Sequence, residues 1–192
     1  MIQNVKILEN QILSDNWYVL RKLSFQYQKE DGAIVTQTRE AYDRGNGATI
    51  LLYNKLQKTV ILTQQFRLPT YINGNPTGLM IEACAGLLDN ENPEDCIKRE
   101  TEEETGYKIS NPQKVMEAYM SPGSVTEILH FFIAEYEPDM KVSAGGGVDH
   151  EQENIEVLEF DFDRALGMVA KGEIKDAKTI MLLQFLRLHN LL

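Results

Sequence analysis

Residues 86–107 read Gly86-Leu-Leu-Asp-Asn-Glu91, then seven further residues, then Arg99-Glu-Thr-Glu-Glu-Glu-Thr-Gly-Tyr107. Four of the five positions 100–104 are glutamates. On a helix, Glu100 and Glu104 are neighbours at i and i+4, and Glu103 lies beside them on the same face. Like charges at this spacing repel one another, whereas a hard cation such as magnesium favours carboxylate oxygens. The run indicates either a solvated acidic face or a metal site, with Glu100 and Glu104 as the best ligands and Glu103 as a second-rank ligand.

Start and stop signals for a helix frame these glutamates. Asn92 suits the N-cap, Pro93 suits the first helical position, and Gly106 is a natural C-terminal stop. Upstream, residues 80–85 are expected to form a strand and residues 85–88 the loop that leaves it. The pattern therefore predicts a strand, a loop and a helix, with carboxylates directed back at the loop.

The same residues resemble the Nudix box, the signature of the Nudix hydrolases, usually spelt Gly-x5-Glu-x7-Arg-Glu-U-x-Glu-Glu-x-Gly-U with U a bulky aliphatic residue. This chain departs from it twice: only four residues separate Gly86 from Glu91, and Thr101 and Tyr107 occupy the aliphatic positions. Neither departure removes a carboxylate or the arginine. The resemblance implies an α/β fold, the Nudix α/β/α sandwich with a mixed sheet. It also implies pyrophosphate hydrolysis with a divalent metal, Mg²⁺ in the first place and Mn²⁺ as the alternative.

Charge and ligand chemistry suggest roles around the box. The backbone carbonyl of Ala85 is expected to join Glu100 and Glu104 as a metal ligand. Arg99 cannot ligate a metal, but its planar donors can hold a carboxylate in place. A bound metal would neutralise the phosphates and activate a water molecule for attack at phosphorus.

The segment 144–155 combines three glycines with several acidic residues. Such a loop can close over a substrate and bring in a general base or a third metal ligand, although an exposed, solvated turn is an equally good interpretation of the sequence alone. Nudix pyrophosphatases acting on ADP-ribose and nucleotide sugars carry a catalytic glutamate in a similar loop. Glu151 and Glu153 are both candidates for that residue, and His150 is a candidate substrate contact.

Composition is consistent with a compact enzyme. The chain has 192 residues, of which 43% are hydrophobic, enough for one good core and a small accessory unit. A net charge of −10 argues against binding nucleic acid through a basic surface. Cys84 and Cys96 have no metal-binding spacing, and no apolar run is long enough to cross a membrane. We therefore expect a cytoplasmic protein with reduced thiols and no membrane partner.

Strand and turn patterns divide the chain near residue 44. Residues 17–27 and 34–43 are expected to form two strands joined by a turn at 30–32, giving a small antiparallel sheet over residues 1–44. Over residues 45–192, the Nudix part, strands are expected at 48–53, 59–67, 114–120, 128–136 and 155–160. Helices are expected at about 162–171 and 177–190.

A narrower resemblance, to the NudK-type GDP-mannose hydrolases, extends over nearly the whole chain. It is carried by residues 43–52, 65–67, 82–90, 120–123 and 144–147 and by Glu127. It implies a magnesium-dependent homodimer that splits GDP-mannose into GMP and mannose 1-phosphate, with exchanged N-terminal sheets that reach the partner's site.

Substrate contacts implied by this resemblance are spread over the chain. Trp17 would stack on the base, Arg67 would meet the phosphates, and Glu127 would contact the sugar or base. The remaining expected contacts are Thr38, Arg39, Glu40, Ala85, Gly86, Leu87, Glu104, His150 and Lys178. Two alternatives remain open: a pyrophosphatase for ADP-ribose or an ADP-sugar, and a non-catalytic nucleotide-sugar sensor.

Overall fold

The computed structural model describes residues 1–148 and 154–192. The chain divides into two compact units. The N-terminal unit comprises Met1–Asn46 and Tyr119–Ile128, and the main unit comprises Gly47–Ala118 and Leu129–Leu192.

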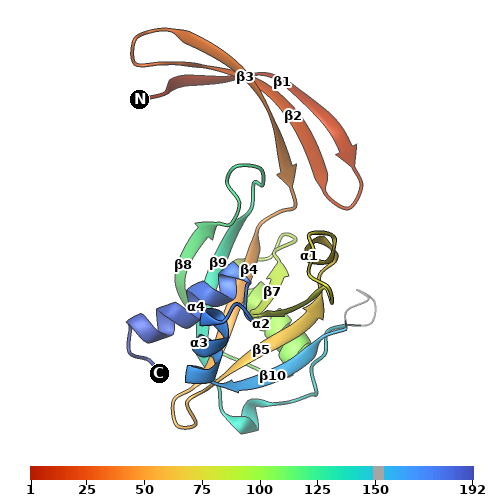
Figure 1. Cartoon of the computed structure of the whole chain (residues 1–192), viewed down its shortest axis with the longest axis vertical. Helices are drawn as coiled ribbons and strands as arrows, with labels where there is room; N and C mark the ends of the chain where they lie inside the picture. The colour runs from red at the N-terminus through yellow and green to blue at the C-terminus, as the bar shows by residue number, and fades with distance from the viewer. Residues whose placement is uncertain (149–153) are drawn as a thin grey trace. The chain divides into compact units, whose positions relative to one another are not determined.

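The N-terminal unit is built on an antiparallel sheet of three strands in the order β1-β2-β3 (Figure 1). These are β1 (Gln3–Asp15), β2 (Val19–Gln28) and β3 (Ile34–Asp43). The turn expected at residues 30–32 joins β2 to β3, and Gly32 adopts a positive φ of 86° there. The sequence predicted β2 and β3 but not β1. Residues 119–128 pack on the end of β3, where the Tyr42 amide donates to the Ser124 carbonyl at 2.7 Å.

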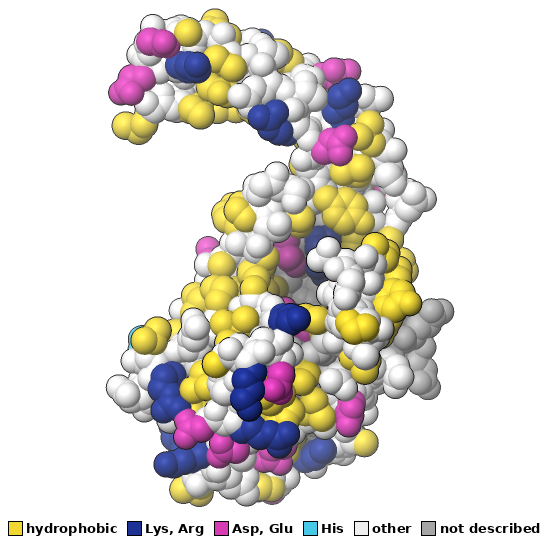
Figure 2. Space-filling model, in the orientation of Figure 1, with side chains coloured by type: hydrophobic (Ala, Val, Ile, Leu, Met, Phe, Trp, Pro, Cys, Tyr) yellow, Lys and Arg dark blue, Asp and Glu magenta, His cyan; other side chains and the backbone are white. Residues whose placement is uncertain are grey.

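Hydrophobic side chains of β1 remain on the surface of the chain. Figure 2 shows such side chains among charged ones on the N-terminal unit. The exposed members in β1 are Val5, Ile7, Leu8, Ile12 and Leu13, each at least 43% exposed. An apolar surface of this kind usually marks a place where another molecule binds.

Within the described residues, the main unit holds a seven-stranded mixed sheet in the order β10-β5-β4-β9-β8. Two short strands extend it: β6 (Leu79–Glu82) pairs with β5 and β7 (Cys84–Leu87) pairs with β4. The long strands are β4 (Gly47–Asn54), β5 (Thr59–Phe66), β8 (Gln113–Tyr119), β9 (Ile128–Glu135) and β10 (Glu156–Asp161). β4 runs parallel to β9 and antiparallel to β5, which confirms the expected mixed sheet.

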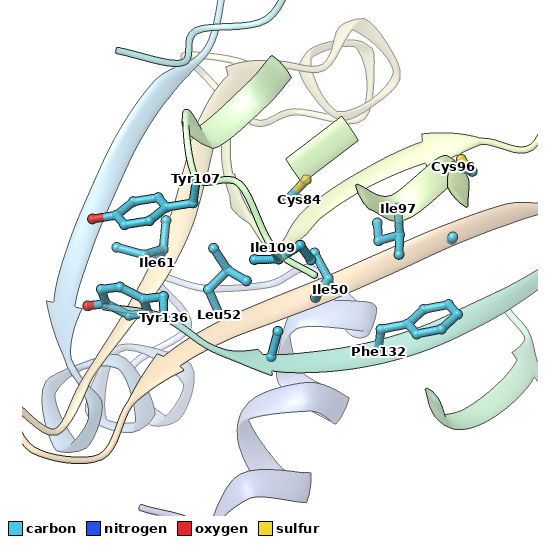
Figure 3. Close-up of a cluster of buried hydrophobic side chains, with 12 residues drawn as sticks. Ile50, Leu52, Ile61, Cys84, Cys96, Ile97, Tyr107, Ile109, Phe132 and Tyr136 are labelled. Atoms are coloured by element: carbon cyan, nitrogen blue, oxygen red, sulfur yellow. The ribbon is translucent and has the colours of Figure 1, made fainter. Parts of the chain in front are cut away.

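Helices pack against both faces of this sheet. The main unit contains α1 (Leu68–Ile72), α2 (Pro93–Thr105), η1 (Pro138–Met140), α3 (Phe162–Ala170) and α4 (Ala177–Leu188). In Figure 3, α2 lies on one side of β4 and β9, while α4 lies on the other. Alternate residues of β4, Ile50 and Leu52, belong to the core cluster that also contains Ile97 of α2. The α/β/α arrangement is therefore confirmed, whereas α1 and η1 were not predicted.

The strand expected at residues 80–85 is interrupted at Ala83, and this part of the prediction was wrong. The Ala83 amide donates to the Thr179 hydroxyl of α4 at 2.6 Å instead of joining a strand ladder. β6 before the break pairs with β5, and β7 after it pairs with β4. Gly86 and Leu87 consequently lie in a strand rather than in a loop.

Candidate functional site

Helix α2 carries the glutamate run, and local signals fix both of its ends. The Asn92 side chain accepts hydrogen bonds from the amides of Glu94 and Asp95 at 3.1 and 3.0 Å. Gly106 ends the helix in the left-handed conformation, with φ of 78°. The helix boundaries predicted from Asn92, Pro93 and Gly106 are confirmed.

The two departures from the aliphatic positions are accommodated inside the protein. Thr101 is fully buried and its hydroxyl donates to the Ile97 carbonyl one turn earlier. Tyr107 is 5% exposed and packs edge-on against Tyr136, with ring centroids 5.0 Å apart. Both side chains therefore fill the core in place of an aliphatic residue.

Glu100 and Glu104 point into the protein. Glu100 is 8% exposed and Glu104 is 2% exposed. Burial raises the pKa of the Cys84 thiol, and the neighbouring carboxylates of Glu104 and Glu100 raise it further. Both glutamates are therefore near enough to β7 to affect the Cys84 thiol on that strand. Glu102 instead faces outward, with Lys108 at 3.8 Å.

Gly86 leaves room for the Glu100 carboxylate. A methyl group added to Gly86 would lie 2.1 Å from both the carboxylate carbon and Oε1 of Glu100. Any larger residue at this position in β7 would have to displace that side chain. The glycine of the motif is therefore explained by the close approach of a helix carboxylate to the strand.

Arg99 binds three of the surrounding carboxylates. Its Nη1 lies 2.8 Å from Glu103 Oε2 and 3.0 Å from Glu100 Oε1. Its Nη2 lies 3.2 Å from Glu91 Oε2. Although partial burial opposes the charge, these carboxylates, Glu100 foremost, raise the pKa of the guanidinium. Arg99 therefore ties the loop before α2 to the glutamate face of the helix.

The chemistry of this donor set fits a divalent cation. Magnesium is commonly bound by one or two carboxylates together with water and substrate phosphates, and Glu100 and Glu104 offer two. Ala85, the third expected ligand, lies in β7 opposite Thr49 of β4. Within residues 1–148 and 154–192, no group of three or more acidic, histidine or cysteine side chains could hold a metal. Glu151 and Glu153, expected to add a carboxylate, and His150 lie outside the described residues.

The glycine segment before those residues is anchored to the end of α2. The amides of Gly146 and Gly147 donate to the carbonyls of Glu104 and Glu103 at 2.9 and 3.1 Å. A cavity of about 550 Å³ lies beside this contact. It is lined by Arg99, Glu102, Glu103, Ser143, Gly145 and Gly147. The glycines thus bring the loop to the glutamate helix.

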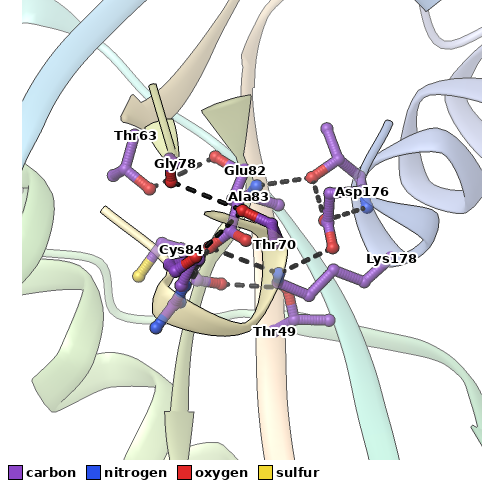
Figure 4. Close-up of polar contacts among 11 residues, drawn as sticks. Thr49, Thr63, Thr70, Gly78, Glu82, Ala83, Cys84, Asp176 and Lys178 are labelled. Atoms are coloured by element: carbon purple, nitrogen blue, oxygen red, sulfur yellow. Dashed lines mark hydrogen bonds and ion pairs between the residues drawn. The ribbon is translucent and has the colours of Figure 1, made fainter. Parts of the chain in front are cut away.

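A second polar cluster joins three elements of the main unit (Figure 4). Arg67 follows β5, Glu82 ends β6, and Lys178 is the second residue of α4. Arg67 donates from Nε and Nη2 to Glu82 Oε2 at 2.9 and 2.7 Å. Lys178 Nζ lies 3.0 Å from Asp176 Oδ1 and 3.7 Å from Glu82 Oε2. Two cations from distant parts of the sequence therefore share one buried carboxylate.

Expected substrate contacts in the β1–β2 turn and in β3 lie on the surface of the N-terminal unit. Trp17 is 84% exposed and packs edge-on against Tyr18. The hydroxyls of Thr38 and Ser24 lie 3.1 Å apart, and Arg39 Nη1 donates to the Thr38 carbonyl at 2.8 Å. Glu40 is exposed beside them on β3.

Glu127 also belongs to the N-terminal unit but is buried. It is 8% exposed, and Arg44 Nε lies 3.6 Å from its carboxylate. The Arg44 guanidinium also lies over the Tyr18 ring, 5.5 Å from its centroid. The structure thus gathers Trp17, Tyr18, Arg44 and Glu127 within one unit.

Sequence reasoning gave no role to Glu82, Asp176 or Arg44. A usable signal existed for Glu82, which is a charged residue in an otherwise apolar stretch, Met80–Ala85. Carboxylates are seldom fully buried without a partner, so a cation was to be expected beside it. Which cation this is depends on the fold, because Arg67 and Lys178 lie far from Glu82 in the sequence.

Two known protein-family models together match most of the chain. Residues 4–42 match the family model described as GDP-mannose pyrophosphatase NudK N-terminal domain, and residues 43–183 match the NUDIX domain.

Similar proteins are found in several bacteria. A GDP-mannose pyrophosphatase of Yersinia enterocolitica serotype O:8 / biotype 1B is 56% identical over 192 residues, which is 100% of both chains. Proteins of the same name from Yersinia pestis (strain Pestoides F) and Pectobacterium atrosepticum are also 56% identical. They cover 98% and 96% of this chain and 94% of their own lengths.

Proposed function

The chain belongs to the NUDIX family, and from this membership we propose that it hydrolyses the pyrophosphate bond of GDP-mannose, yielding GMP and mannose 1-phosphate. The observation that carries the proposal is the buried pair Glu100 and Glu104 in an intact set of motif carboxylates, with Glu100 packed against Gly86. Full-length relatives named GDP-mannose pyrophosphatase support the choice of substrate. Because the motif is undamaged, a non-catalytic sensor is not favoured.

Nudix hydrolases generally use divalent metal ions, and we assign Mg²⁺ to Glu100, Glu104 and the Ala85 carbonyl, with Mn²⁺ as the alternative. When bound, such an ion neutralises phosphate charge and lowers the pKa of a bound water. Arg99 would hold the glutamate face in register through Glu91, Glu100 and Glu103. Outer contacts of this kind keep ligand side chains oriented.

Other residues of the chain would bind the substrate and move the proton. Arg67 and Lys178 supply positive charge for the diphosphate, for which a planar guanidinium is well suited. Water adds its oxygen to one phosphorus, the bridging oxygen leaves with the other phosphate, and a loop carboxylate accepts the proton. Glu151 and Glu153 remain the two candidates for that base. Trp17, Thr38, Arg39, Glu40 and Glu127 are assigned to the base and sugar.

A homodimer is part of the proposal. The support for it is the uncovered apolar surface of β1, since hydrophobic side chains on an isolated sheet are stabilised by covering them. No helix in the described residues is long and apolar enough to span a membrane. The free, buried thiols Cys84 and Cys96 are consistent with the cytoplasmic location that we also propose.

The substrate assignment is tested by measuring kcat/KM side by side for GDP-mannose, ADP-ribose, ADP-glucose and UDP-glucose with Mg²⁺. Chromatography of the products should show GMP and mannose 1-phosphate, and GDP-mannose should give the highest kcat/KM. A preference for ADP-ribose would replace the substrate while leaving the reaction type unchanged. Absence of cleavage of all four compounds would refute the proposed function.

A further inference from the structure

Glu82 contacts two cations that lie far apart in the sequence of the main unit, Arg67 and Lys178. The carboxylate is buried, with its side chain 6% exposed, at the end of β6. Arg67 reaches it from the end of β5. Lys178 reaches it from the start of α4 (Figure 4). A buried carboxylate requires compensating charge, and here two cations supply it.

Within residues 1–148 and 154–192, the arrangement leaves donor capacity on both cations. Arg67 uses Nε and Nη2 for the same oxygen, Glu82 Oε2, so neither hydrogen bond involves Nη1, and its side chain is 40% exposed. Lys178 has three ammonium donors, and among the residues that the structure describes its ion-pair partners are Asp176 Oδ1 at 3.0 Å and Glu82 Oε2 at 3.7 Å. Burial opposes the charge on Arg67, but Glu82 raises the pKa of the guanidinium. Glu82 therefore offsets the cost of burying the arginine's charge.

The backbone fixes Glu82 relative to α4. Asp176 caps the helix by accepting from the Thr179 amide at 3.0 Å and also accepts from the Thr179 hydroxyl. That hydroxyl in turn accepts from the amide of Ala83, the residue after Glu82, at 2.6 Å. Two hydrogen bonds in series thus connect the cap residue beside Lys178 to the break between β6 and β7.

We propose that Glu82, supported by Asp176, is a positioning residue that holds Arg67 and Lys178 as one pair for binding the substrate's diphosphate. The proposal rests on the function proposed above and adds a residue that does not touch the substrate. Its physical basis is preorganisation: two long, flexible cations are ordered before the anion arrives, so the anion does not have to order them. The break in the strand at Ala83 contributes to this arrangement, because the Ala83 amide bonds to Thr179 of α4.

The test is Glu82→Gln, which keeps the shape of the side chain but removes its charge. We expect KM for GDP-mannose to rise about 10- to 100-fold, as for loss of a hydrogen bond to a charged group, with kcat changed less than about threefold. The control is Glu135→Gln, which removes the partner of Lys55 at 2.9 Å outside this cluster and should leave both constants unchanged. A KM for Glu82→Gln that equals or falls below the wild-type value would overturn the proposal.

A double-mutant cycle separates positioning from a general effect on structure. If Glu82 acts through Arg67, Glu82→Gln should add little to the KM increase caused by Arg67→Ala. Fully additive effects of the two changes would contradict the proposal. If Glu82→Gln unfolds below the assay temperature, Asp176→Asn is measured in its place. We expect KM for GDP-mannose to rise in this variant, and an unchanged KM would contradict the proposal.

Calorimetric binding of inorganic pyrophosphate gives a readout that does not depend on turnover. Wild-type protein should bind it at least tenfold more tightly than Glu82→Gln. If the wild type cleaves no nucleotide sugar, the proposed function fails, and this binding ratio still decides the role of Glu82. If the wild type is active and both proteins bind pyrophosphate equally, the positioning role fails while the function stands.

Discussion

Replacing Gly86 by alanine should inactivate the enzyme while leaving it folded. The added methyl carbon would stand 2.1 Å from the Glu100 carboxylate, whereas ordinary contact begins at 3.4 Å. The carboxylate must therefore move by about 1.3 Å, and a displacement of about 1 Å in a reacting site costs about 100-fold in rate. We expect kcat for GDP-mannose to fall about 100-fold or more.

Stability should respond much less, because the atoms that must move are the end of a side chain. Gly86 does not have a positive φ, so alanine can adopt its backbone conformation. Alanine also lowers the conformational entropy of the unfolded chain, which favours folding. We expect the free energy of unfolding in guanidinium to change by no more than about 1–2 kcal/mol.

The matched control is Gly167→Ala in α3, where an added methyl group has nothing within 4 Å. Helix propensity predicts a gain of about 0.5–1 kcal/mol in stability with unchanged activity. Full activity of Gly86→Ala would show that the close approach of Glu100 to Gly86 has no part in the reaction. Equal loss of activity and of folded protein would also contradict this prediction.

Three further predictions follow from α2 and its surroundings. Arg99→Lys loses the guanidinium contacts from Nη1 to Glu103 and from Nη2 to Glu91. Activity, or the metal affinity measured in a Mg²⁺ titration, should fall about 10- to 100-fold. Unchanged activity and metal affinity would contradict this prediction. Asn92→Ala removes the helix cap and should cost about 1 kcal/mol in guanidinium unfolding at unchanged activity; an equally stable variant would count against the cap. Burial raises the pKa of the Cys96 thiol to about 12 in the folded protein, whereas an unfolded cysteine has a pKa of about 8.5. Above about pH 8.5 the unfolded chain therefore binds fewer protons than the folded one, and the free energy of unfolding falls as pH rises. The loss amounts to about 2 kcal/mol at pH 10. Denaturation from pH 7 to 10 should show this loss, with a smaller loss in Cys96→Ala; equal losses would refute the assignment.

Features that depend on neighbouring residues were predictable from the sequence. The ends of α2 follow from Asn92, Pro93 and Gly106, each of which acts within one turn of its own position. β1 escaped prediction because register shifts, as between Ile7 and Glu9, interrupt the alternation that identifies a strand. α1 is too short, at five residues, to show a helical period.

Features that depend on distant residues were not predictable. The strand break at Ala83 is made by the hydroxyl of Thr179, 96 residues further along the chain. The expected contacts Arg67 and Lys178 were named separately, and only the fold shows that they share Glu82. Contacts between residues so far apart in the sequence depend on how α4 packs on the sheet. The sequence around each residue does not indicate this packing.

We attribute the metal-dependent hydrolysis to the two buried glutamates of α2, Glu100 and Glu104. The most direct measurement is the rate of Mg²⁺-dependent GMP release from GDP-mannose by Glu100→Gln and Glu104→Gln. The control is Glu94→Gln, which removes only an exposed pair with Lys98 on the same helix. We predict rates reduced by at least about 100-fold in both site variants, as for loss of groups that act in the transition state, and a rate within about twofold of wild type in the control. Full activity in both site variants would show that neither glutamate takes part in the hydrolysis.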